Sequence, residues 1–269
     1  MMILALALAL QVGVLPDKWL SGGPNCAEIP DWQVHAYNDD LLILRQSGCV
    51  HYEKPFLYLL FGKDRAMLLD TGAGKPGTAA IVDKLRRKMP LIVVHSHGHG
   101  DHVAGDAELK ALPGVTVMTP GYAETIDLGG RKIEALPIPG HDAKSVAFYD
   151  ERTGILLTGD SLYPGRLYVD DFPAFVTSMK RLLEFTESRP VSHVLGTHIE
   201  QSRTPFVDYI VRTTYQPAEH SLELSRAHLV ELVRELELMG GKPERKALRS
   251  FTITPRPPRN FANGSTATP

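Results

Sequence analysis

Six consecutive residues, His97-Gly98-His99-Gly100-Asp101-His102, contain four side chains that can bind a metal ion. The run follows closely on the apolar stretch 91–94, which is typical of a buried strand. Imidazole nitrogen and carboxylate oxygen are ligands that Zn²⁺ and Fe²⁺ accept, and the two glycines allow a tight turn between them. The sequence therefore predicts a metal site in the loop at the end of this strand.

Further ligands are expected downstream, because one ion takes three or four protein ligands and a six-residue loop does not bring all four side chains to one ion. Three candidates each follow a short β-prone run: His141, Asp160 and His198. Each of them alone is typical of a turn after a strand. Together with the first cluster they predict a complete metal site built from several strand ends.

The order of these motifs resembles that of the metallo-β-lactamase superfamily. Asp70-Thr71-Gly72 corresponds to the first motif of that family, the cluster at 97–102 to the second, and His141, Asp160 and His198 to the other three. The resemblance runs from about Phe56 to about Glu200. It implies an α/β fold, an αββα four-layer sandwich, with the metals at one edge between the two sheets.

The resemblance also implies roles for individual residues. One metal would be held by His97, His99 and His141, the second by Asp101, His102 and His198, with Asp160 bridging both. Asp70 would orient the loop without binding a metal, and Ser145 would support the site by hydrogen bonding. The implied cofactor is a pair of Zn²⁺ ions, with Fe or Mn as alternatives.

Two divalent ions about 3.5 to 4 Å apart can share a water and lower its pKa to about 7, which supplies hydroxide at neutral pH. We expect that hydroxide to attack the carbonyl of a small substrate: a thioester, a lactone or other ester, or an amide. Asp101 is the expected catalytic residue, which orients the hydroxide or carries a proton to the leaving group. The predicted function is thus that of a dinuclear zinc hydrolase.

Other branches of the superfamily give alternatives. Asp160 stands where the zinc β-lactamases have Cys or Ser, so the chain resembles glyoxalase II and lactonases more closely, and β-lactamase activity is retained as an alternative. A mononuclear iron oxidoreductase like the persulfide dioxygenases is the second alternative. Lys and Arg total 29 against 31 Asp and Glu, with no dense basic run, so we expect no nucleic-acid partner.

The segment 161–168 follows Asp160 and is the expected wall of the substrate site. Tyr163 is predicted to donate a hydrogen bond to the substrate, and Arg166 to bind a carboxylate.

Residues 1–20 are expected to be either a secretory signal peptide or a buried N-terminal extension, because the apolar run 2–10 lacks a preceding Lys or Arg. The run is too short to span a bilayer, so no stable membrane insertion is expected. A periplasmic or secreted location is favoured over a cytoplasmic one. In an exported protein Cys26 and Cys49 could pair; otherwise they are separate thiols.

The hydrolase domain is expected over 21–254, and an irregular tail over 255–269. Strands are predicted at 32–37, 41–45, 56–61 and 66–69. Helices are predicted from about Pro76 through Met89, at 173–187 and at 219–238, with a helix start at Thr204-Pro205.

Overall fold

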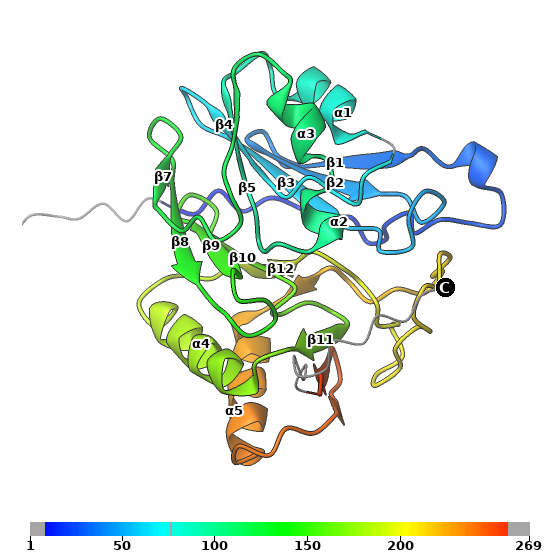
Figure 1. The fold of residues 1–269 in the computed structure, drawn as a ribbon, viewed down its shortest axis with the longest axis vertical. Coiled ribbons are helices and arrows are strands. Elements are labelled where there is room, and N and C mark those ends of the chain that lie inside the picture. Colours follow the sequence, from blue (N-terminus) through cyan, green and yellow to red (C-terminus); the bar gives the residue numbers. More distant parts are fainter. Residues whose placement is uncertain (1–8, 76, 258–269) are drawn as a thin grey trace, which may run out of the picture.

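The computed structural model describes residues 9–75 and 77–257 of the 269-residue chain. Two six-stranded sheets lie face to face, and helices cover the outer face of each (Figure 1). The first sheet consists, in spatial order, of β1 (Trp32–Asn38), β2 (Leu41–Gln46), β3 (Phe56–Phe61), β4 (Ala66–Leu69), β5 (Leu91–Val94) and β6 (Val115–Val117). The second consists of β13 (Glu223–Leu224), β12 (His193–Gly196), β10 (Ile155–Gly159), β9 (Val146–Asp150), β8 (Lys132–Pro137) and β7 (Ile126–Asp127).

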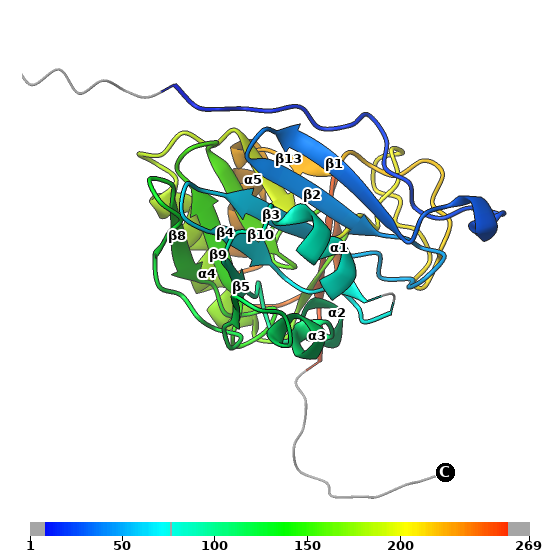
Figure 2. The ribbon, with the colours of Figure 1, turned by 90° about the horizontal axis from the view of Figure 1, so that it is seen from above.

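The helices form the outer layers, and a small third sheet completes the fold. The helices are the 3-10 helix η1 (Cys26–Glu28) and the α-helices α1 (Thr78–Leu85), α2 (Gly100–Val103), α3 (Asp106–Lys110), α4 (Phe172–Phe185) and α5 (Arg226–Leu238). The third sheet contains β11 (Arg166–Val169), β15 (Thr252–Pro255) and β14 (Lys246–Ala247). Figure 2 shows α1 and the first sheet in front of the layer that α4 and α5 form.

The layers follow from strands that are apolar on both faces. Along β3, Tyr58 and Leu60 pack in the core between the two sheets, whereas Leu57 and Leu59 pack outward against Val82 of α1. Successive side chains of a strand point to opposite faces, so an uninterrupted apolar run must be covered on both sides.

The outer face of the second sheet is covered in the same way. Phe175 and Met179 of α4 and Leu229 of α5 pack in one cluster with Leu156 of β10. Helices thus lie outside both sheets, and the predicted αββα sandwich is confirmed.

Several predicted elements differ from the observed ones. The helix expected at 219–238 begins only at Arg226, because Glu223 and Leu224 pair with β12 as strand β13. The first helix ends at Leu85, and residues 87 and 88 have positive φ angles of 56° and 59°, which a helix does not contain. Residues 203–207 form turns instead of a helix.

The ends of the predicted domain also differ. Trp19 lies before the expected domain start at residue 21, yet it is buried against Phe56. Pro255, the first residue of the expected irregular tail, is the last residue of β15. Most of the apolar run 2–10 and residues 258–269 of the tail lie outside the described residues, so those parts stay predictions.

Cys26 and Cys49 form a disulfide that joins η1 to the connection between β2 and β3. Of the two alternatives that the sequence left open, the structure therefore contains the paired one. Within the part of the chain that the structure describes, no helix is both long and apolar enough to cross a membrane.

One buried arginine joins the two sheets. The Arg131 guanidinium donates to both carboxylate oxygens of Asp150 in the second sheet, at 3.1 and 2.6 Å. It also donates to the backbone carbonyls of Asp40 and Phe61, which belong to the first sheet and its edge, at 2.6 and 2.9 Å. The side chains of Arg131 and Asp150 are almost fully buried, so neither charge has water as an alternative partner.

We predict that Arg131→Met lowers the free energy of unfolding by about 3–5 kcal/mol, because it leaves the Asp150 carboxylate buried and unpaired. Urea unfolding measures the change, with Arg249→Met at an exposed position as the control, for which about 0.5 kcal/mol or less is expected. A loss below about 1 kcal/mol in Arg131→Met would show that the pair does not stabilise the sheet contact.

Candidate metal centre

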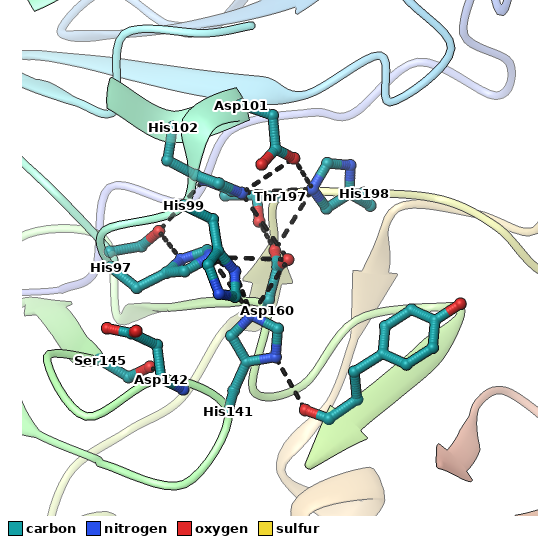
Figure 3. A network of polar contacts seen from close by, with 12 residues as sticks. His97, His99, Asp101, His102, His141, Asp142, Ser145, Asp160, Thr197 and His198 are labelled. Carbon is teal, nitrogen blue, oxygen red and sulfur yellow. Dashed lines mark hydrogen bonds and ion pairs between the residues drawn. The ribbon is translucent and has the colours of Figure 1, made fainter. Parts of the chain in front are cut away.

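The predicted ligands lie in loops at one edge of the two sheets (Figure 3). β4 and β5 are parallel neighbours, and so are β10 and β12, so the carboxyl ends within each pair lie together. The loop after β5 and helix α2 carry the cluster 97–102, Asp160 directly follows β10, and His198 follows β12. The connection between β8 and β9 carries His141.

One group of ligand atoms belongs to three histidines. His97 Nε2 lies 2.9 Å from His99 Nδ1, and His141 Nε2 lies 3.2 and 3.1 Å from these two atoms. Two nitrogens bound to one tetrahedral zinc at 2.0–2.1 Å are roughly 3.3 Å apart. The spacing of the three nitrogens therefore fits a shared metal ion.

A second group contains Asp101, His102 and His198. Asp101 Oδ2 lies 3.3 Å from the Nε2 atoms of both histidines, and these two nitrogens are 3.4 Å apart. The ligand atoms of this group lie within 4.8 Å of one another, as do those of the first group. The donor set, two imidazoles and a carboxylate, is one that zinc or iron accepts.

The Asp160 carboxylate lies between the two groups. Its Oδ2 atom is 3.9 Å from His97 Nε2 and 3.6 Å from His141 Nε2, and its Oδ1 atom is 3.4 Å from His198 Nε2. The Thr197 hydroxyl donates to Oδ1 and so holds the carboxylate in place. The structure thus brings together all seven residues that the sequence analysis named as ligands.

Hydrogen bonds on the outer side of the rings determine which nitrogen faces the centre. His141 Nδ1 lies 2.8 Å from the Tyr168 carbonyl oxygen, and His198 Nδ1 lies 2.9 Å from the Glu53 carbonyl oxygen. Because a carbonyl only accepts, each Nδ1 carries a proton, and each Nε2 faces the centre as the atom that can bind a metal. Converging lone pairs repel one another unless a cation or proton lies between them, so the donor chemistry also fits bound metal.

Asp70 lies behind the centre and not among the ligand atoms. Its carboxylate accepts from the Ser96 N–H and hydroxyl, both at 2.7 Å, and from His102 Nδ1 at 2.9 Å. Asp70 is fully buried and has a φ of 64°, a conformation that non-glycine residues seldom adopt. These contacts place it to orient His102 and the start of the histidine loop.

Ser145 closes the loop that carries His141. Its hydroxyl accepts from the Asp142 N–H at 3.2 Å, and its own N–H donates to the Asp142 carbonyl at 3.2 Å.

Gly159, at the end of β10, allows the strand to approach the histidine loop closely, because a Cβ at this position would lie 2.6 Å from Ser96 Cβ.

Electrostatics distinguish the two groups. Burial lowers the pKa of His97 well below its usual value, and it also lowers the pKa of His141. Burial would lower the pKa of His198 as well, but the carboxylates of Asp160 and Asp101 outweigh it and raise that pKa to about 9. His97 and His141 are therefore neutral over the physiological range, whereas His198 stays protonated in the absence of metal.

The two predicted substrate residues have partners within the protein. Tyr163 is buried, and its hydroxyl lies 2.9 Å from Glu200 Oε2 and 2.5 Å from the Arg166 carbonyl oxygen, so its single proton is donated to one of these two acceptors. Arg166 lies 3.2 Å from Glu200 and 3.7 Å from Asp208. In this arrangement the Tyr163 hydroxyl is not available to a substrate, because its hydrogen-bonding capacity is used inside the fold.

Several residues that hold the ligands were not predicted from the sequence. Ser96 and Thr197 each precede a ligand directly, and this adjacency was the available signal. The carbonyls of Glu53 and Tyr168 had no signal, since any residue provides a carbonyl.

A family model described as the metallo-beta-lactamase superfamily matches residues 55–122 and 119–198. The two ranges run together over more than half of the chain and contain all seven ligand candidates. The chain therefore belongs to the metallo-beta-lactamase superfamily.

Among curated proteins, the chain is similar to enzymes named hydroxyacylglutathione hydrolase. The one from Xanthomonas euvesicatoria pv. vesicatoria is 28% identical over 148 residues, which cover 49% of this chain and 56% of the relative. The one from Anaeromyxobacter dehalogenans is 35% identical over 121 residues, covering 40% and 46% respectively. The chain thus spans about half the length of these relatives.

Solved structures share the fold. A metallo-beta-lactamase from Pontibacter korlensis superposes with a TM-score of 0.55 at 18% identity, covering 77% of this chain and 99% of that one. The metallo-beta-lactamase FIM-1 from Pseudomonas aeruginosa, in its mono-zinc form, gives a TM-score of 0.56 at 14% identity, covering 80% and 98%. Identities this low show the fold and carry no statement about substrate.

We predict that Asp70→Ala lowers the affinity for metal about 10–100-fold, because His102 loses the carboxylate that orients it. Competition with a zinc-binding dye measures the affinity. Asp39→Ala, an exposed aspartate, is the control and should retain the wild-type value. Unchanged affinity in Asp70→Ala would show that the His102 ring is held without this contact.

We further predict that the metal bound by the Asp101, His102 and His198 group is lost first on acidification. The raised pKa values of His102 and His198 mean that protons compete with metal there, while His97 and His141 stay neutral. Dialysis in steps from about pH 8 to about pH 5, followed by metal analysis, should give release in two steps. Simultaneous loss of all metal would contradict this assignment.

Proposed function

We propose that this protein is a dinuclear metal hydrolase that uses water to cleave a small carbonyl substrate, with zinc as its metal. The observation that carries the proposal is the position of the Asp160 carboxylate between two separate groups of ligand atoms. A carboxylate with one oxygen near each group is suited to bridge two ions.

Metal ions held by these groups would polarise the substrate carbonyl and lower the pKa of water to about 7. Among the protein residues, Asp101 is placed to orient the attacking water. Its side chain is 19% exposed, so it reaches the solvent side of the centre. Burial opposes ionisation, but the imidazoles of His102 and His198 outweigh it and hold the pKa of Asp101 far below its usual value. The carboxylate therefore stays ionised and accepts a hydrogen bond from water.

A water-based mechanism is supported by the state of the other nucleophiles. Cys26 and Cys49 are joined in a disulfide, so neither provides a thiolate. The Ser96 hydroxyl donates to Asp70, and the Thr197 hydroxyl donates to Asp160. These two hydroxyls are thus engaged in holding a ligand or its support.

The substrate class is proposed from the chemistry of the centre and from the relatives together. Hydroxide attacks thioesters, lactones and other esters readily, and the curated relatives are named for hydrolysis of a hydroxyacyl thioester of glutathione. Thioesters are therefore the first compounds to test.

We predict about two zinc ions per chain and turnover of at least one thioester, lactone or aryl ester in a panel that also contains β-lactams. Asp160→Ala and His102→Ala should lower turnover to background and metal content to about one ion per chain, because each removes a shared or second-group ligand. Metal analysis and initial rates measure both effects, and Asp39→Ala should change neither.

The same experiment separates the alternatives. One iron per chain with oxygen-dependent turnover would contradict hydrolysis and indicate a persulfide dioxygenase-like enzyme. Preferential turnover of β-lactams would indicate a β-lactamase. Full activity in both ligand variants would overturn the assignment of the centre.

A further inference from the structure

A small cavity lies beside the metal centre, between the segment that precedes β3, strand β11 and the chain that follows β12. Its volume is about 60 Å³. The lining residues that matter here are Glu53, Lys54, Arg166, Tyr168, Glu200 and Arg212. Because liquid water occupies roughly 30 Å³ per molecule, the cavity has room for a group of about two waters in size.

The cavity is coupled to both groups of ligands through the backbone. The Glu53 carbonyl accepts from His198 Nδ1 at 2.9 Å, and the Tyr168 carbonyl accepts from His141 Nδ1 at 2.8 Å. Glu200, on the same wall, follows His198 by two residues. The walls of the cavity therefore contact the outer side of one ligand imidazole from each group.

Lys54 is the unusual residue in this lining. Its side chain is buried, and its ammonium group donates to the carbonyls of Tyr52 and Thr213, both at 2.9 Å. An ammonium has three N–H donors, so one is not used by these contacts. Among the described residues no carboxylate lies within 4.0 Å of Lys54 Nζ. Buried lysines ordinarily form ion pairs, so we expect this one to bind an anion.

The carboxylates of Glu219, Glu200 and Glu53 all raise the pKa of Lys54, and the first two are committed to arginines. Glu219 binds Arg45 through both oxygens at 2.6 Å, and Glu200 binds Arg166 at 3.2 Å. Of the charged residues that line the cavity, three are cationic and two are acidic, so the lining as a whole has an excess of one positive charge.

Two further properties of Lys54 fit a binding role. Burial, with the Arg45 charge nearby, lowers its pKa to about 8, so it is still mostly protonated at neutral pH. Its φ of 49° lies in the left-handed region, which residues other than glycine seldom adopt, so the surroundings hold the residue where it is.

We propose that this cavity binds a carboxylate group of the substrate through the Lys54 ammonium, so that the preferred substrates are carbonyl compounds that also carry a carboxylate. The proposal rests on the proposed hydrolytic function. A carboxylate matches the cavity in size and supplies the negative charge that would pair with the Lys54 ammonium, whereas an alkyl chain does neither. Arg212, at the exposed side of the cavity, adds attraction for the approaching anion.

The first test compares two thioesters that differ in one group, S-acetyl-3-mercaptopropionate and its neutral amide. The wild-type protein should hydrolyse the carboxylate compound with a kcat/KM about 10–100-fold higher, mainly through KM, because a charge-assisted hydrogen bond is lost in the amide. Lys54→Met should remove this preference, so that the variant hydrolyses the carboxylate compound and the amide with kcat/KM values within about twofold of each other. Lys63→Met, an exposed lysine at the other end of β3, is the matched control and should retain the preference.

A second measurement does not depend on turnover. Calorimetry on the zinc-loaded protein compares succinate, glutarate and adipate with the matching half-amides, in which one carboxylate remains free to bind the metal. At least one diacid should bind wild-type protein about tenfold or more tightly than its half-amide, and Lys54→Met should lose the difference.

The outcomes separate the two proposals. Absence of turnover with a retained preference in calorimetry would overturn the hydrolase and leave the carboxylate site standing. Equal binding of diacids and half-amides by the wild-type protein would overturn the carboxylate site, whether or not Lys54→Met folds. An equal loss for both thioesters in a folded Lys54→Met would show a structural role and likewise overturn it.

Discussion

The structure depends on gathering five imidazoles and two carboxylates, most of them buried, within one hydrogen-bond network. Groups of this kind are costly to remove from water unless each has a partner. The network supplies these partners through Asp70, Ser96 and Thr197, and through two backbone carbonyls. What remains at the middle is a set of converging lone pairs and negative charge, and this is the property that makes the centre a receptor for divalent cations.

The two sheets are the scaffold that allows the ligands to converge. Parallel neighbours β4 and β5 in one sheet, and β10 and β12 in the other, end at the same edge, so short loops bring ligands from distant parts of the chain together. The core between the sheets and the Arg131 contact keep the two halves in register. Ligands on rigid strand ends are held more precisely than ligands on long loops would be.

Sequence patterns predicted the elements that depend on local information. The limits of the strand at 56–61 were predicted to the residue, because turns flank its apolar run on both sides. Sequence patterns were less successful for elements whose structure depends on pairing between strands. Glu223 and Leu224 have a helical pattern with their neighbours, yet the free edge of β12 takes them as a strand. Tyr163 had the right position beside Asp160, but its hydroxyl turned inward to Glu200.

The sequence by itself determined the family, the layer order and the seven ligand candidates. Ligand chemistry depends on residue type, and apolar runs indicate the strands. Only the tertiary structure decided which nitrogen of each imidazole faces the centre and which carbonyls orient the rings. It alone placed Lys54 in a cavity without a carboxylate partner among the described residues. Such properties arise from distances between segments that are far apart in the chain, and no local pattern records them.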